Sequence, residues 1–127
     1  MKFTPQSISD VILIEPTVHG DERGYFMESF KQDVFENALG YKVNFIQDNE
    51  SKSTKGVLRG LHYQLPPYAQ AKLVRVVKGS VLDVAVDIRQ NSNTFGQYVS
   101  LVLSEENKKQ LFVPRGFAHG FIVLSKE

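Results

Sequence analysis

Several features that define other classes of protein are missing from this sequence of 127 residues. It has no cysteine, which excludes disulfide bonds, thiolate metal sites and cysteine nucleophiles. Its formal net charge is only +1, so composition gives no reason to expect nucleic acid or a membrane surface as a partner. Its apolar runs fall far short of the roughly 20 residues of a membrane-spanning helix. We therefore expect a cytoplasmic protein without a signal peptide.

The pattern of the chain predicts a single domain over residues 1–127, because no repeat, low-complexity segment or linker interrupts it. One helix is predicted over 31–39, where apolar residues recur at helical spacing before a glycine. Short strands separated by turns are expected over 11–14, 41–47, 57–64, 72–77, 81–88, 98–103, 110–113 and 120–124. A proline pair, Pro66-Pro67, ends one strand and opens a loop. Many short strands with one minor helix predict an all-β sandwich or barrel.

The clearest strand, at 81–89, alternates apolar and mostly polar residues with a period of two. One face carries Leu82, Val84, Val86 and Ile88. The opposite face carries Asp83, Asp87 and Arg89. This alternation is typical of a strand whose two faces meet different surroundings.

Two segments place polar residues inside strand-like apolar sequence, and both resemble the motifs of cupin barrels. In the first, Gly56 precedes His62 by six residues, and Lys72 precedes Gly79 by seven. Cupins that bind a metal carry a glutamate at the position of Lys72 and a second histidine at that of Gln64. A divalent transition metal prefers imidazole and carboxylate ligands, and an ammonium group would repel it. We therefore expect no bound metal.

The second segment matches the cupin pattern Pro-x-Gly-x-x-His in full, at Pro114, Gly116 and His119. The resemblance implies a cupin-type jelly-roll barrel with His62, Lys72 and His119 in its pocket. A single histidine in a strand is more often a core residue, but three pocket positions together favour a site. A histidine can accept a proton at neutral pH, and an ammonium group can stabilise an oxyanion. The pairing suits removal of a proton next to a carbonyl group.

Two arginines could bind a phosphate group of the substrate. Arg59 lies three residues before His62, and Arg23 lies within the segment DERG at 21–24. Guanidinium groups bind phosphate through two parallel hydrogen bonds. A role as ordinary surface arginines is an equally open interpretation of both residues.

Seven segments carry a resemblance to one family, the dTDP-4-dehydrorhamnose 3,5-epimerases. They are DERGYFME (21–28), QDNESKS (47–53), GVLRGLHYQLPP (56–67), QAKLV (70–74), DVAVDIR (83–89), FG (95–96) and VPRGFAHGF (113–121). The resemblance covers nearly the whole chain in order. It implies a homodimer that needs no metal or other cofactor and inverts carbons 3 and 5 of a 4-keto-6-deoxyhexose on dTDP.

The resemblance also implies roles for individual residues. His62 resembles the general base, Lys72 the group that stabilises the enolate, His119 a substrate contact and Asp83 a second pocket acid beside Lys72. Arg23 and Arg59 resemble contacts to the diphosphate and sugar, and Phe26 a residue that packs near the thymidine. The residues that resemble nucleotide contacts are Glu28, Gln47 and Asn49.

The family's acid tyrosine and the aspartate that orients its histidine are expected beyond Glu127. Two alternative functions stay open. The first is a dTDP-sugar 3,4-ketoisomerase, although that family carries a second histidine where this chain has Gln64. The second is a protein that binds a nucleotide-sugar without catalysis.

Overall fold

The computed structural model describes residues 1–64 and 70–126, and the predicted all-β character is confirmed. Within these ranges one short helix, α1 (Gln32–Leu39), accompanies the strands. The strands are β1 (Lys2–Pro5), β2 (Ile12–Glu15), β3 (Val18–Asp21), β4 (Gly24–Met27), β5 (Leu58–His62), β6 (Lys72–Arg75), β7 (Ser80–Asp87), β8 (Tyr98–Ser104), β9 (Gln110–Val113) and β10 (Phe117–Val123).

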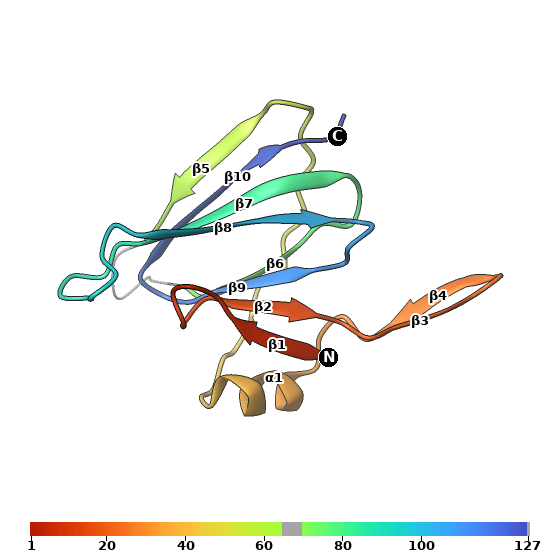
Figure 1. The fold of residues 1–127 in the computed structure, drawn as a ribbon, viewed down its shortest axis with the longest axis horizontal. Coiled ribbons are helices and arrows are strands. Elements are labelled where there is room, and N and C mark those ends of the chain that lie inside the picture. Colours follow the sequence, from red (N-terminus) through yellow and green to blue (C-terminus); the bar gives the residue numbers. More distant parts are fainter. Residues whose placement is uncertain (65–69, 127) are drawn as a thin grey trace.

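Two four-stranded antiparallel sheets face each other as a sandwich (Figure 1). The first sheet has the strand order β1-β2-β9-β6, and the second has the order β5-β10-β7-β8. Strands β9 and β10 follow each other in the chain but lie in different sheets, so the short turn between them crosses the sandwich. Strands β3 and β4 form a separate ribbon that projects away from both sheets (Figure 1).

The main core lies between the two sheets. Ala85 of the second sheet belongs to the same buried cluster as Leu111 and Val113 of the first. A second cluster covers the outer face of the first sheet, where the rings of Phe35 of α1 and Phe112 of β9 lie 5.4 Å apart. Helix α1 therefore covers the outer face of the first sheet, whereas the main core fills the space between the two sheets.

Strand β7 alternates as the sequence predicts, and its acidic face points into the sandwich. Asp83 and Asp87 are both 0% exposed, on the same face as Ala85. Leu82 and Val84 lie half-buried on the outer face. A buried carboxylate is costly unless it is paired or hydrogen-bonded, so the fold must supply partners for both aspartates.

The strand predicted over 41–47 is wrong, because this segment has no regular secondary structure. Its apolar residues Val43 and Phe45 pack into the cluster beneath α1. Side chains of α1 bind the backbone there: Gln32 Nε2 donates to the Val43 carbonyl at 3.0 Å, and the Val43 amide donates to Glu36 at 3.3 Å. A neighbouring strand is not needed to satisfy these groups.

The sequence pattern missed strands β1, β3 and β4. Strand β1 is four residues long, lies at a sheet edge and ends at Pro5. Strands β3 and β4 pair only with each other and are largely exposed, so they lack the apolar alternation of a half-buried strand. The helix ends before Gly40 as predicted. The predicted break at Pro66-Pro67 lies outside the described residues.

Candidate active site

Two histidines lie side by side on the inner face of the second sheet. His62 ends β5, His119 lies in β10, and the antiparallel register pairs them directly. Directly paired residues share a face, with their Cβ atoms roughly 5 Å apart. His119 also pairs with Ala85 of the main core, so this face looks into the sandwich. His119 is buried, whereas His62 at the end of its strand is exposed.

Asp83 of β7 holds the inner histidine. Nε2 of His119 lies 2.8 Å from Oδ1 of Asp83. With the carboxylate as acceptor, Nε2 of His119 is the donor of this hydrogen bond, which leaves Nδ1 as an acceptor for another partner. The second Asp83 oxygen, Oδ2, is buried and has no hydrogen-bond partner within residues 1–64 and 70–126. Asp83 and His119 therefore form a buried polar pair in which one Asp83 oxygen can still accept a hydrogen bond.

Lys72 enters the same interior from the facing sheet. It begins β6 and pairs directly with Val113 of β9, whose side chain belongs to the core between the sheets. Lys72 shares that inner face and is half-buried. The predicted group therefore lies on the two facing inner surfaces, with His62 and His119 on one sheet and Lys72 on the other. Asp83, which is predicted to be a second pocket acid, forms its side-chain hydrogen bond with His119, and its nearness to Lys72 stays a prediction.

Two glycines allow the histidine-bearing strands to approach each other closely. Gly60 has φ +108, and a Cβ atom there would lie 2.7 Å from the Cα of Gly120. A Cβ atom on Gly120 would lie 2.6 Å from the carbonyl oxygen of Arg59. Any side chain at either position would force β5 away from β10, and His62 would move with it.

Three other predicted ligand residues lie on β5 and on the chain that leads into it. The exposed Arg59 donates from Nε to the Ser53 hydroxyl at 2.6 Å. Gln47 Nε2 donates to Asn49 Oδ1 at 3.2 Å. Gln47 also lines a cavity of about 580 Å³, together with Tyr41, Lys42, Gln70, Arg89 and Arg115. This cavity reaches the outer face of the first sheet, because Phe112 lines it too.

The β3–β4 ribbon carries Arg23 and Phe26, and Glu28 follows directly after it; the fold does not bring these residues to the histidines. Arg23 pairs with Asp21 at 2.7 Å, and both side chains are exposed. This hydrogen bond lowers the pKa of Asp21 and raises that of Arg23. Phe26 is 71% exposed, and with Glu28 it lines a separate cavity of about 260 Å³. The ribbon projects away from both sheets (Figure 1).

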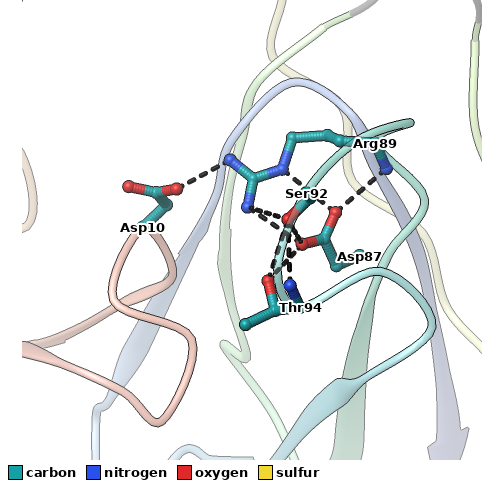
Figure 2. Close-up of polar contacts among 5 residues, drawn as sticks. All are labelled: Asp10, Asp87, Arg89, Ser92 and Thr94. Atoms are coloured by element: carbon teal, nitrogen blue, oxygen red, sulfur yellow. Dashed lines mark hydrogen bonds and ion pairs between the residues drawn. The ribbon is translucent and has the colours of Figure 1, made fainter.

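The sequence pattern did not single out as functional an ion pair at the end of β7, whose aspartate is buried and whose arginine is partly buried. Figure 2 shows Asp87 at its centre, bound by Arg89 at 2.9 Å, by the Ser92 hydroxyl at 2.6 Å and by the Thr94 hydroxyl. Arg89 also reaches Asp10 at 2.7 Å. The hydrogen bonds from Arg89 hold the pKa of Asp87 far below its usual range. The signal that could have found this pair is its Asp-x-Arg spacing, which repeats that of Asp21 and Arg23.

No group of three or more histidine, cysteine or acidic side chains in the described part of the chain could hold a metal ion. No helix in that part is long and apolar enough to cross a membrane. The expectation that no metal is bound stays a prediction.

Comparison with known protein sequences gives a consistent result. A family profile described as dTDP-4-dehydrorhamnose 3,5-epimerase matches residues 5–127. The dTDP-4-dehydrorhamnose 3,5-epimerase of Shigella flexneri is 67% identical over 127 residues, which are 100% of this chain and 70% of that protein. The enzyme of the same name from Escherichia coli strain K12 is 61% identical over 98% of this chain and 68% of its own length.

Solved structures agree with the sequence matches. The dTDP-6-deoxy-D-glucose-3,5-epimerase from Legionella pneumophila Philadelphia 1, in complex with dTDP-4-keto-L-rhamnose, superposes with a TM-score of 0.95 at 54% identity, covering 98% of this chain and 66% of that one. The dTDP-4-dehydrorhamnose 3,5-epimerase from Elizabethkingia anophelis NUHP1 gives a TM-score of 0.94 at 56% identity, covering 99% and 69%. The chain therefore spans about two thirds of the length of these relatives.

Proposed function

The chain belongs to the dTDP-4-dehydrorhamnose 3,5-epimerase family, and we propose that it inverts carbons 3 and 5 of dTDP-4-dehydro-6-deoxy-D-glucose. Membership agrees with the predicted cupin-type fold, which the match to solved epimerases confirms. Both inverted carbons lie next to the carbonyl at carbon 4, so loss of either proton gives an enolate. One base and one oxyanion-stabilising group could therefore serve both centres.

The observation that supports this proposal is that the strand register places His62 on the inner face of the second sheet and Lys72 on the inner face of the first. His62 accepts the proton from the carbon next to the carbonyl, and the electron pair of that C–H bond moves so that the carbon-4 oxygen becomes an enolate oxygen. The ammonium group of Lys72 stabilises this negative charge in a site partly shielded from water. Return of a proton to the opposite face of the ring then inverts the centre.

The other predicted residues are proposed as ligand contacts. His119, whose Nε2 is hydrogen-bonded to Asp83, would accept a hydrogen bond at Nδ1 from a hydroxyl group of the substrate. Arg59 and Arg23 contact the diphosphate and sugar, because guanidinium groups bind phosphate in a bidentate manner. Phe26 packs against the thymidine, as aromatic side chains commonly do with bases. The remaining nucleotide contacts are Glu28, Gln47 and Asn49.

We also propose that the enzyme is a homodimer. The β3–β4 ribbon carries Arg23 and Phe26 away from the chain's own histidines, so it could supply them to the pocket of a second copy (Figure 1). The outer face of the second sheet is free of charged side chains on its four strands and carries Leu58, Leu82, Val84, Val86, Val102 and Ile122. Leu58 is 70% exposed and Val102 is 44% exposed. An apolar sheet face of this kind suits a self-complementary interface with a second copy.

The reaction is proposed to need no metal and to take place in the cytoplasm. Gln64 and Lys72 stand where metal-binding cupins have ligands. The cysteine-free sequence also suits a reducing compartment.

The decisive experiment incubates the protein with dTDP-4-dehydro-6-deoxy-D-glucose in deuterated buffer and follows deuterium by NMR. We expect label at carbons 3 and 5, with no loss of rate in EDTA. Label at carbon 3 alone would indicate a ketoisomerase or an enzyme that epimerises one centre. A protein that binds dTDP without any labelling would be a nucleotide-sugar binding protein, and the epimerase proposal would be wrong.

A matched pair of variants tests the role of the base. His62→Ala should abolish labelling and leave the Kd for dTDP within about twofold, because loss of general-base catalysis alone costs roughly 10²–10⁴-fold. Tyr63→Phe, next to it, should keep the wild-type rate. If the affinity of His62→Ala for dTDP fell as far as its rate, His62 would be a binding residue.

A further inference from the structure

Arg89 is held by three separate parts of the chain at the end of β7. Its Nε and one terminal nitrogen bind Asp87 at 3.0 and 2.9 Å. The second of these nitrogens also contacts the Ser92 hydroxyl at 3.4 Å, in the loop after β7. The other terminal nitrogen donates to Asp10, in the turn before β2, at 2.7 Å. Figure 2 shows the guanidinium between these partners.

The same side chain packs on the turn that joins β9 to β10. Gly116 has φ +86, and a Cβ atom there would lie 2.4 Å from Cγ of Arg89. The Arg89 guanidinium lies 4.8 Å from the centre of the Phe117 ring. The Ile88 amide donates to the Gly116 carbonyl at 3.1 Å, and Asp87 pairs directly with Phe117. Arg89 thus closes over a turn that has no room for a side chain at Gly116.

This turn connects the two halves of the proposed active site. Val113, the last residue of β9, pairs with Lys72 in the first sheet. Phe117 begins β10, and two residues later His119 pairs with His62 in the second sheet. The three residues between Val113 and Phe117 therefore set how the sheet with Lys72 sits relative to the sheet with the histidines.

We propose that Arg89 is a positioning residue, which holds the 114–116 turn so that Lys72 and His62 face the same reacting carbons. This inference rests on the proposed epimerase reaction. A direct role in ligand binding is disfavoured, although Arg89 lines the cavity of about 580 Å³. Each of its three nitrogens already donates to a protein oxygen.

The kinetic test compares Arg89→Ala and Arg89→Lys with the control Arg75→Ala, which removes an exposed arginine from β6. Displacing reacting groups by about 1 Å can cost on the order of 10²-fold in rate. We therefore expect kcat for deuterium labelling to fall about 10²-fold in Arg89→Ala and less in Arg89→Lys, which keeps the charge but loses the planar fork. The Kd for dTDP should stay within about twofold, and Arg75→Ala should match the wild type. An unchanged kcat in a folded Arg89→Ala protein would overturn the proposal.

A distance measurement tests the same proposal without activity. Because the chain has no cysteine, spin labels can be placed through Tyr63→Cys on the chain just after His62 and Arg75→Cys on β6. With the labelled chains diluted in an excess of unlabelled chains, so that pairs between two labelled chains are rare, electron–electron double resonance should give one narrow distance in the wild-type background. Arg89→Ala should broaden or shift that distribution at a temperature where circular dichroism shows a folded protein; an identical distribution would contradict the proposal. If the wild type incorporated no deuterium, the epimerase proposal would fail. The distances between the two spin labels would still decide whether Arg89 holds the two sheets in place.

Discussion

The ribbon tip and the end of β7 contain the same short motif in two different settings. In each, an aspartate precedes an arginine by two residues, as Asp21 and Arg23 or as Asp87 and Arg89. In each, the arginine amide donates to Oδ1 of the aspartate, at 2.8 Å on the ribbon and 2.9 Å at β7. In each, a guanidinium nitrogen reaches Oδ2, at 2.7 and 2.9 Å. Local sequence therefore determines nearly the same geometry twice.

The two pairs differ in burial. The side chains of Arg23 and Asp21 are 90% and 52% exposed, whereas those of Arg89 and Asp87 are 34% and 0% exposed. An exposed pair is screened by water and salt, and its arginine can exchange partners at little cost. A buried pair that loses one partner leaves a charge without compensation. The same motif thus holds an exposed arginine in one place, which we propose contacts the ligand, and a largely buried arginine in the other, which we propose positions the 114–116 turn.

The largest expected difference between the pairs is in folding stability. Asp87→Asn should lower the free energy of unfolding by about 3 kcal/mol, because it removes the charge that compensates a partly buried arginine. Asp21→Asn should leave urea denaturation unchanged within error. Equal effects of the two substitutions would mean that burial does not distinguish the pairs.

The second largest expected effect is on ligand binding, and it concerns the exposed pair on the β3–β4 ribbon. Arg23→Gln should raise the Kd for dTDP by roughly 10- to 30-fold, since it removes a charge-assisted contact, without moving the thermal midpoint. Calorimetric titration measures the affinity, and Arg23→Lys separates charge from bidentate geometry. If the ribbon serves a second copy, a mixture of Arg23→Gln and His62→Ala chains, assayed at a substrate concentration well below the wild-type KM, should recover about a quarter of the wild-type rate of deuterium incorporation. Half of the randomly formed dimers then contain one intact site. No recovery would place Arg23 in its own chain's site.

The smallest effect is a pH dependence that belongs to the buried pair. The folded-state pKa of Asp87 is lowered by Arg89, so its contribution to stability is complete above its unfolded pKa of about 3.9 and declines as the pH falls below that value. Between pH 6 and pH 3 the wild type should lose about 1 kcal/mol more stability than Asp87→Asn. Urea denaturation at several pH values measures this difference. Parallel curves for the two proteins would contradict the lowered pKa.

Tertiary contacts also explain why the sequence predicts a strand over 41–47 that does not form and misses the two ribbon strands. The segment 41–47 has the composition of a strand, but Gln32 and Glu36 of the preceding helix bind its backbone at Val43. The ribbon strands lack an apolar face because they pack against neither sheet. In the first case the deciding partners lie outside the segment, and in the second the strands lack a partner sheet, so no local pattern could reveal either outcome.

The all-β class, the helix before Gly40 and the family could be predicted from the sequence alone, because period-two alternation and motif spacing are local properties. The same motifs single out His62, Lys72 and His119 as the proposed site. The sequence also determined that β7 has two different faces. Only the tertiary structure decided which face turns inward, that Asp83 binds His119, and that of two Asp-x-Arg pairs one is exposed and the other buried. The physical reason is that burial, which sets the cost of an unpaired charge, depends on strands distant in the chain.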